Sequence, residues 1–263
     1  MSFSRFCMVT ALLATGCEPA ELTYPGLDLG LGGQDLYIDS DGDGLTDDEE
    51  AELGTDPDSS DTDLDGWGDY EEFERNTDPT NGADAPYTGG WPIGDCRNDI
   101  QADNSLEQDG VAPNFALTDM HGDTVQLHDF CHMAVLVVTG AEWCGPCQSY
   151  RDGMASYMDQ YFSRGLMVID LLGETNAGEA PSETDLERWA NNHNYAVVGD
   201  PNWSVSSTGY GLSFPASTLM APGAVVVSLN NGDPGPQAIE AVLPAGFTLP
   251  SYVEDDMEAA ANH

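Results

Sequence analysis

Lysine is absent from this sequence of 263 residues, and six arginines are its only strongly basic side chains. They stand against 47 acidic residues, so the formal net charge at pH 7 is −41. So negative a chain repels phosphate backbones, which excludes nucleic acid as a partner. It also lacks the basic patch that docks proteins on anionic lipid. The excess of carboxylates instead favours the binding of cations.

Long hydrophobic runs are also absent. The apolar stretch from Phe6 to Ala14 is too short to span a bilayer, but it is typical of a signal-peptide core behind one positive charge, Arg5. It ends in the segment Leu13-Ala14-Thr15-Gly16-Cys17, which resembles the lipobox of bacterial lipoproteins, with the leucine one position early. The resemblance implies a leader over residues 1–16 and a lipid on Cys17. An ordinary secretory signal is the alternative, and both interpretations place the chain where disulfides form.

The acidic residues are concentrated between residues 39 and 84, where 19 acids accompany one arginine. Two sets with the same spacing, 22 residues apart, match positions 1, 3, 5, 7, 9 and 12 of a calcium-binding loop, with glycine at position 6. The sets are Asp39, Asp41, Asp43, Leu45, Asp47 and Glu50, then Asp61, Asp63, Asp65, Trp67, Asp69 and Glu72. Calcium prefers many oxygen ligands, so the spacing predicts two calcium sites. An acidic disordered segment is the alternative.

A full EF-hand would need a long helix after each loop. Here Gly54 and Asn76 each precede a Thr-Asp-Pro triplet, which ends a helix after about two turns. The pattern resembles the bacterial thrombospondin type 3 repeat over residues 39–82. The resemblance implies a structural spacer with little regular structure, whose folding depends on calcium. An EF-hand-like sensor is the less favoured interpretation.

The second half of the chain alternates predicted strands and helices. Residues 134–138 and 166–172 are short apolar runs typical of strands buried on both faces. Helices are predicted to about residue 163 after the first run and over residues 181–192, with Ser182 as N-cap. A hairpin is predicted over residues 216–229. This order favours an α/β fold with a central mixed sheet flanked by helices.

A Cys-Gly-Pro-Cys motif follows the first buried strand, with Trp143 directly before Cys144 and Cys147 closing it. Together with Ala112-Pro113-Asn114-Phe115 and with Tyr210-Gly211 followed by Phe214-Pro215, it resembles the redoxin or TlpA-like branch of the thioredoxin superfamily over residues 111–232, within a predicted domain of residues 111–246. The resemblance implies a thioredoxin fold and thiol–disulfide exchange, with Cys144 as attacking thiol, Cys147 as resolving thiol and Pro215 as a cis-proline. A helix N-terminus would favour the Cys144 thiolate. A static disulfide or half of a zinc site are the alternatives.

Two features depart from that family. Tyr150 stands where many TlpA-like proteins have a glutamate, and no acid occurs within residues 134–138, where thioredoxins keep a buried carboxylate. Glu142 is the nearest candidate for that carboxylate, and Arg151 is a distant candidate for stabilising the thiolate.

Two further cysteines remain, Cys96 in the linker and Cys131 just before the first buried strand. In an oxidising compartment they are expected to form a structural disulfide that fixes the preceding linker to the domain. A second redox relay is the alternative.

The sequence therefore predicts an exported, lipid-anchored thiol–disulfide oxidoreductase of the bacterial cell envelope that acts on protein thiols or disulfides, with structural calcium and no organic cofactor. Residues 17–38 are a predicted tether, residues 83–110 a linker and residues 247–263 an acidic tail. A peroxiredoxin-like peroxidase and a calcium-dependent surface-binding protein with an inactive redoxin domain are the alternatives, with copper delivery a minor one.

Overall fold

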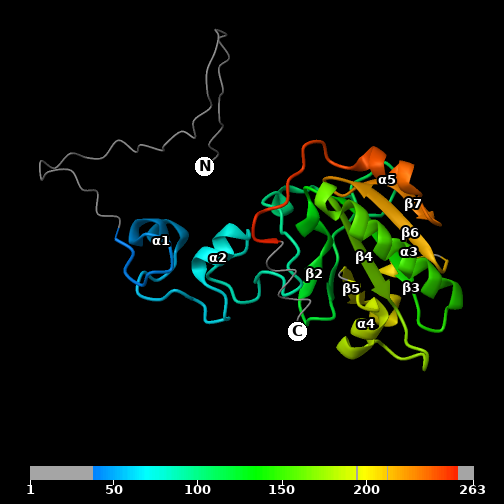
Figure 1. Cartoon of the computed structure of the whole chain (residues 1–263), viewed down its shortest axis with the longest axis horizontal. Helices are drawn as coiled ribbons and strands as arrows, with labels where there is room; N and C mark the ends of the chain where they lie inside the picture. Colours follow the sequence, from blue (N-terminus) through cyan, green and yellow to red (C-terminus); the bar gives the residue numbers. More distant parts are fainter. Residues whose placement is uncertain (1–37, 194, 212, 254–263) are drawn as a thin grey trace, which may run out of the picture. The chain divides into compact units, whose positions relative to one another are not determined.

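The computed structural model describes residues 38–193, 195–211 and 213–253, and the described residues from 39 onward form one compact unit (Figure 1). The predicted leader, Cys17 and nearly all of the tether lie outside the described residues, as does the end of the predicted acidic tail. Within the described ranges, no helix has both the length and the apolar character needed to cross a membrane.

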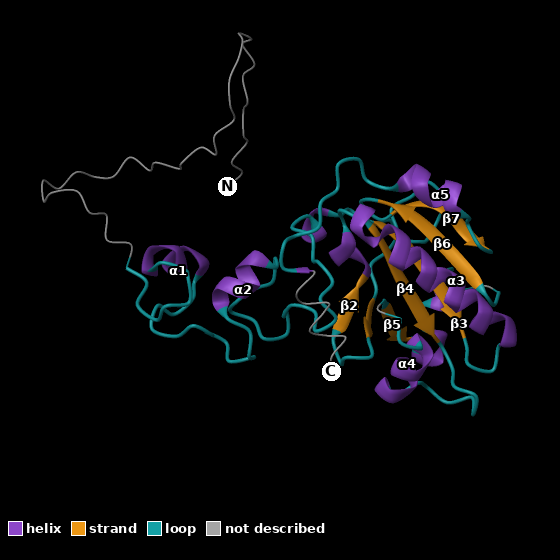
Figure 2. Ribbon diagram, in the orientation of Figure 1, coloured by secondary structure: helices purple, strands orange, loops and turns teal. Residues whose placement is uncertain are grey.

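A five-stranded mixed sheet forms the centre of the domain, with the strand order β5-β4-β3-β6-β7 (Figure 2). The strands are β3 (Ala134–Gly140), β4 (Leu166–Leu172), β5 (Ala196–Gly199), β6 (Ala216–Ala221) and β7 (Val225–Asn231). β3, β4 and β5 run parallel, whereas β6 and β7 are antiparallel to their neighbours. This arrangement confirms the predicted α/β class and thioredoxin fold.

The two central strands are buried along their whole length, which is why their sequences are continuous apolar runs rather than alternating ones. The exception in β4 is Asp170, which is 1% exposed and pairs in register with Val138 of β3. A lone carboxylate in such a strand requires hydrogen-bond donors around it.

Two helices connect the parallel strands: α3 (Gly145–Tyr161) lies between β3 and β4, and α4 (Glu183–Ala190) lies between β4 and β5. A third helix, α5 (Pro236–Val242), follows β7. Ser182 caps α4 as predicted, in a capping box with Asp185. Right-handed crossovers put α3 and α4 on one face of the sheet. Gly140 confirms this, because a Cβ atom there would lie 3.3 Å from Cys147 of α3 and 3.4 Å from the Trp189 ring of α4.

Residues 83–110, predicted as a linker, lie against the domain and contribute to its core. Tyr87, Trp91, Ile93 and Leu106 are buried in the same hydrophobic cluster as the sheet. These side chains show no helical or strand period, so their burial depends on tertiary packing alone. Val253, in the predicted acidic tail, is also fully buried.

The remaining strands and helices are short. A hairpin of β1 (Ala116–Thr118) and β2 (Thr124–Gln126) precedes the sheet. The acidic segment holds two short helices, α1 (Asp47–Leu53) and α2 (Asp69–Glu74). α1 ends at Gly54 in the left-handed conformation, as the Thr-Asp-Pro pattern predicts. Short 3-10 helices span Arg97–Asp99, Leu127–Phe130, Phe162–Arg164, Pro201–Trp203 and Ser206–Thr208.

Candidate functional site: a helix-capping cysteine pair

Cys144 occupies the N-cap position of α3, where β3 gives way to the helix. Its Sγ atom accepts a hydrogen bond from the backbone N–H of Cys147 at 3.3 Å. The first turn of a helix has unpaired N–H groups and a partial positive charge, so this position stabilises negative charge on sulfur. Pro146 fits the first turn because a residue there needs no intrahelical N–H bond.

The structure brings the two predicted redox cysteines together as a disulfide. Cys144 is 7% exposed and Cys147 only 2% exposed, so Cys144 presents the more accessible sulfur. An incoming thiolate therefore reaches Cys144 first, and Cys147 is placed to leave and return as the resolving thiol.

Pro215 lies at the same end of the sheet as Cys144. The Phe214–Pro215 peptide bond is cis, as the family resemblance implies. Ala216, the next residue, pairs with Thr139 near the end of β3, directly before the loop that carries the cysteines. This register places the backbone of Phe214 and Pro215 beside the redox loop.

Three aromatic rings surround this end of the sheet. Phe214 makes a T-shaped contact with Trp143, with centroids 6.4 Å apart, and a closer contact with Trp203 at 4.6 Å. The Glu174 carboxylate accepts hydrogen bonds from both indole N–H groups, at 2.9 Å from Trp143 and 3.2 Å from Trp203. Trp143 is 51% exposed, so the cluster offers an apolar surface beside the cysteine pair. Trp203 and Glu174 carried no signal in the sequence.

Glu142, the candidate for a buried carboxylate, is buried but fully engaged. One oxygen forms an ion pair with Arg188 at 2.6 Å, and the other accepts hydrogen bonds from Asn176. Arg151 pairs with Asp152 and donates to the Trp189 carbonyl. These contacts fix the loop rather than leave Glu142 free as a proton acceptor.

The buried carboxylate lies one strand away, at Asp170. Its Oδ2 atom accepts hydrogen bonds from Trp189 Nε1 at 2.8 Å and from the Tyr195 hydroxyl at 3.2 Å, whereas Oδ1 has no partner. Burial raises the pKa of Asp170 to about 6, although the two hydrogen bonds lower it in part. Trp189 also contacts the Gly140 position, as Cys147 does. The sequence analysis did not identify Asp170, because the buried carboxylate was expected within residues 134–138 and not on the neighbouring strand.

The acidic loops gather their predicted ligands in two groups. Carboxylate oxygens of Asp39, Asp41 and Asp43 lie within 4.8 Å of one another, and so do those of Asp61, Asp63 and Asp65. Five side-chain oxygens in the loops are buried without a partner: those of Asp41 Oδ2, Glu50 Oε2, Asp63 Oδ2, Asp65 Oδ2 and Glu72 Oε2. Orphaned buried oxygens in this number fit a cation site.

Electrostatics in the loops supports that fit. Burial, then repulsion by Asp65 and Asp63, raises the pKa of Glu72 to about 8. Burial and repulsion by Asp41 and Asp43 raise the pKa of Glu50 to about 6. Both carboxylate oxygens of Asp47 accept hydrogen bonds from Ser40, and both oxygens of Asp69 accept hydrogen bonds from Thr62.

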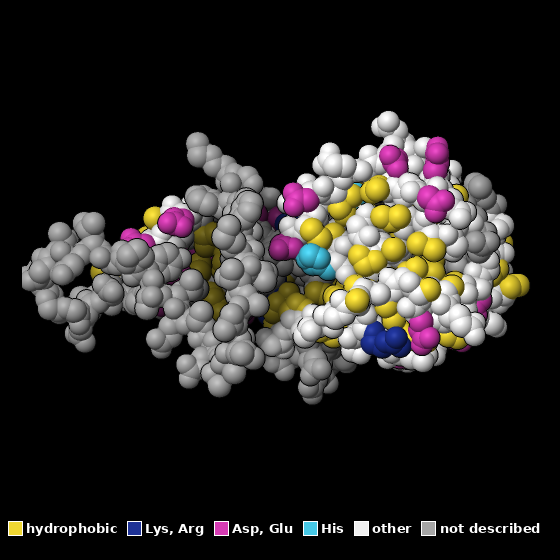
Figure 3. All heavy atoms as spheres, turned by 90° about the horizontal axis from the view of Figure 1, so that it is seen from above, with side chains coloured by type: hydrophobic (Ala, Val, Ile, Leu, Met, Phe, Trp, Pro, Cys, Tyr) yellow, Lys and Arg dark blue, Asp and Glu magenta, His cyan; other side chains and the backbone are white. Residues whose placement is uncertain are grey.

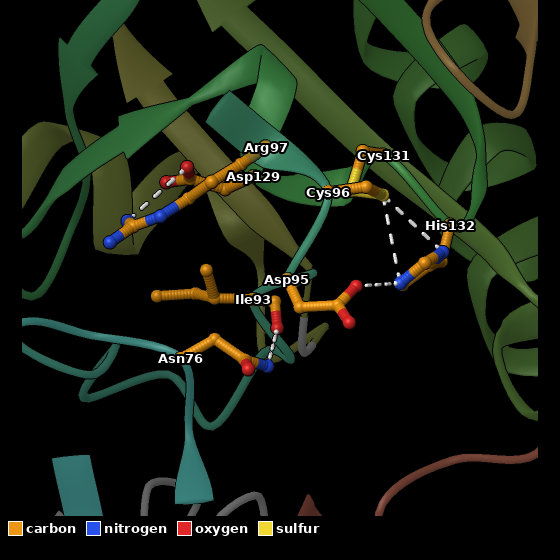
Figure 4. Close-up of a disulfide and its surroundings, with 8 residues drawn as sticks. All are labelled: Asn76, Ile93, Asp95, Cys96, Arg97, Asp129, Cys131 and His132. Carbon is orange, nitrogen blue, oxygen red and sulfur yellow. Dashed lines mark hydrogen bonds and ion pairs between the residues drawn. A yellow bond between two sulfur atoms is a disulfide. The ribbon is translucent and has the colours of Figure 1, made fainter. Parts of the chain in front are cut away.

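Cys96 and Cys131 form the second disulfide (Figure 4). Cys131 directly precedes His132, whose ring lies between Cys96 and Asp95. The pairing agrees with the expectation from the sequence, whereas its structural role stays a prediction.

Residues 109–231 match the AhpC/TSA family, and residues 39–57 match the bacterial TSP3 repeat. The AhpC/TSA match covers the residues that form the five-stranded sheet of the thioredoxin fold. Among curated relatives, thiol-disulfide oxidoreductase ResA of Bacillus subtilis (strain 168) is 27% identical over 49% of this chain and 69% of its own length. The ResA of Bacillus thuringiensis subsp. konkukian is 30% identical over 26% of this chain and 40% of its own length.

Solved structures with similar chains include the thioredoxin domain of a thiol-disulfide oxidoreductase from Bacteroides vulgatus. It is 19% identical, with a TM-score of 0.43, over 52% of this chain and 96% of that one. A thiol:disulfide interchange protein of the thioredoxin family from Chlorobium tepidum is 16% identical, with a TM-score of 0.42, over 52% of this chain and 99% of that one.

The buried carboxylate of the thioredoxin-like domain gives a pH-dependent prediction. The folded state binds a proton at Asp170 more tightly than the unfolded chain does, so stability falls as pH rises from about 4 to about 6. Asp170→Asn keeps an oxygen that can accept from Trp189 and Tyr195 but removes the buried charge. We expect the variant to exceed the wild type in free energy of unfolding by about 3 kcal/mol at pH 8, and by little near pH 4.

Urea unfolding at both pH values, in saturating calcium, measures this difference. Asp159→Asn removes an exposed charge from α3 and serves as the matched control, with little change at either pH. A gap between Asp170→Asn and wild type of the same size at pH 8 and pH 4 would contradict the assignment.

Proposed function

We propose that this chain is an exported thiol–disulfide oxidoreductase that exchanges electrons with protein thiols or disulfides in the bacterial cell envelope through Cys144 and Cys147. The observation that supports this most directly is the hydrogen bond from the Cys147 amide to Cys144 Sγ at the start of α3. The names of the curated relatives agree with this activity. The proposal includes a lipid on Cys17 as the membrane anchor.

The exchange proceeds in two displacements. The Cys144 thiolate attacks one sulfur of a substrate disulfide, forming a mixed disulfide and releasing the first substrate thiolate. Cys147 then attacks Cys144 Sγ, forms the Cys144–Cys147 disulfide and releases the second substrate thiolate. Two electrons pass from the protein dithiol to the substrate, and the sequence of steps runs in reverse when the substrate is a dithiol.

The surroundings of Cys144 favour polypeptide substrates. Trp143 and Phe214 offer exposed apolar surface at the cysteine pair, and Glu174 fixes the orientation of the neighbouring indoles. Acidic side chains are spread over the face of the molecule seen in Figure 3, while dark blue arginine is confined to a small area. This balance favours substrates that carry positive charge near their cysteines.

Calcium belongs to the proposal as a structural ion. The residues that would hold it are the acidic positions of the two loops and the backbone carbonyls of Leu45 and Trp67. The ion supplies positive charge that offsets the repulsion among crowded carboxylates. Residues 39–82 bury few apolar side chains, with Leu45 the sole fully apolar one buried among the described residues of the two loops. We therefore propose that they act as a calcium-dependent spacer next to the redox domain.

Trapping of a mixed disulfide tests the redox proposal. Cys147→Ser removes the resolving thiol. We therefore expect this variant to accumulate a mixed disulfide between Cys144 and insulin, which peptide mass mapping identifies. Cys144→Ser keeps the helix cap through its hydroxyl group and is the matched control. It should form no adduct in the motif and should lower insulin reduction by a dithiol donor roughly tenfold or more. Equal insulin reduction by Cys144→Ser and wild type would overturn the proposal.

Calorimetry tests the calcium proposal on the full chain after chelation. We expect heat of calcium binding at or below millimolar ion, together with protection of residues 39–82 from proteolysis. Glu72→Gln removes a carboxylate from the second loop and should weaken binding there by roughly tenfold or more. Asp58→Asn, an exposed acid outside both ligand sets, is the control. No heat at millimolar calcium would show that these loops do not bind the ion.

A further inference from the structure

The Cys96–Cys131 disulfide has an imidazole and a carboxylate beside it, which a purely structural bridge does not need. Cys96 Sγ lies 3.3 Å from His132 Nδ1 and 3.6 Å from Nε2. His132 Nε2 also lies 2.6 Å from Asp95 Oδ1 (Figure 4). A sulfur, an imidazole and a carboxylate are the groups that serve as nucleophile, base and orienting group in activated-cysteine enzymes, and here the three lie together.

The carboxylate holds the ring beside the disulfide. Asp95 Oδ1 lies 2.6 Å from His132 Nε2, and both ring nitrogens lie within 3.6 Å of Cys96 Sγ. The other acid beside the disulfide, Asp129, does not compete for His132, since it pairs with Arg97 at 3.6 Å and accepts from Tyr87. His132 is therefore placed to take a proton from a Cys96 thiol.

Access to the two sulfurs is unequal. Cys131 is 4% exposed, and Gly94 lies so close that a Cβ atom there would be 2.5 Å from Cys131 Sγ. Cys96 is partly exposed and lies beside His132, whose side chain is 56% exposed. Thiols and disulfides in solution therefore reach Cys96 first, whereas Cys131 has the protected position of a resolving thiol.

A cavity of about 430 Å³ opens next to this pair. Asp95 and His132 line it together with apolar side chains that include Ile93, Met133 and Phe247. Asn76 also lines the cavity and donates to the Ile93 carbonyl at 2.8 Å. A cavity of this size and character accepts an apolar side chain adjacent to a cysteine of a peptide or protein disulfide.

We infer that Cys96 and Cys131 form a second redox-active dithiol centre, with Cys96 as nucleophile, His132 as its base and Asp95 as the group that orients His132. Its substrates are peptide or protein disulfides that carry an apolar side chain next to the cysteine. The inference adds to the proposed function and does not rest on Cys144.

The second centre is separate from the first. Cys131 precedes the start of β3 and Cys144 follows its end, and the seven residues of this strand span roughly 20 Å. The two disulfides therefore cannot exchange directly within one molecule. Each centre must receive electrons from its own dithiol donor, or from a mobile dithiol that visits both.

Thiol–disulfide exchange at this centre takes place in two displacements. His132 takes the Cys96 proton, and the Cys96 thiolate attacks the substrate disulfide, releasing one substrate thiolate that takes the proton from His132. Cys131, on losing its proton to solvent, attacks Cys96 Sγ and releases the second substrate thiolate, which is protonated by solvent. The protein dithiol becomes the Cys96–Cys131 disulfide, and the substrate disulfide becomes two thiols. A dithiol donor restores the reduced centre.

The test uses the full chain with Cys144→Ser and Cys147→Ser, so that the first centre contributes nothing. After treatment with excess dithiothreitol and its removal, iodoacetamide labelling at pH 7 is followed by peptide mass mapping. We expect the second disulfide to open and Cys96 to be labelled well before Cys131. His132→Gln should slow labelling of Cys96 roughly tenfold or more, and Asp95→Asn several-fold, because the base is lost or misoriented. Asp99→Asn removes an exposed charge from the same segment and should leave the rate unchanged.

Oxidised glutathione is the substrate probe. The reduced double variant should be reoxidised through a glutathione adduct on Cys96, and His132→Gln should slow this step by a similar factor. The inference would be overturned if the Cys96–Cys131 disulfide stayed closed at a dithiothreitol concentration that opens the Cys144–Cys147 disulfide of the wild type. So would labelling of Cys96 at the same rate with and without His132. Labelling of Cys144 in the wild type reports on the proposed function independently of either result.

Discussion

The structure depends on one contact, in which the backbone N–H of Cys147 donates to Cys144 Sγ at the first turn of α3. The same hydrogen bond caps a helix of 17 residues and places a sulfur where the helix favours negative charge. Buried β3 delivers the loop to this point, and the β3–β6 register brings cis-Pro215 to the same end of the sheet. Helix stability and sulfur chemistry therefore rest on the same geometry.

The two ends of β3 are built differently. At its C-terminal end, an apolar cluster held by Glu174 surrounds a sulfur that depends on a helix terminus. At its N-terminal end, a partly exposed sulfur lies beside an imidazole and a carboxylate. With no lysine in the chain, neither centre has an ammonium group to stabilise a thiolate. The acidic loops instead bring carboxylates together, with buried oxygens that have no hydrogen-bond partner and that fit a divalent ion.

Features with a local cause were predictable from the sequence. The runs 134–138 and 166–172 are strands because they are apolar throughout, α4 begins after Ser182 because that residue caps it, and α1 ends where Gly54 adopts a left-handed conformation. Features that arise from tertiary packing were not. The strand Ala196–Gly199 is too short to show a pattern, and Trp91 has no period that marks its burial. Asp170 replaces the missing carboxylate from a neighbouring strand, and His132 meets Cys96 across 36 residues, so only the fold reveals either.

Selective alkylation of the reduced Cys144–Cys147 pair tests the central contact most directly. With limiting iodoacetamide at pH 7 and peptide mass mapping, a sulfur at the helix N-cap should react first, so that Cys144 is labelled at least about tenfold faster than Cys147. Equal labelling of the two cysteines, or faster labelling of Cys147, would contradict the account.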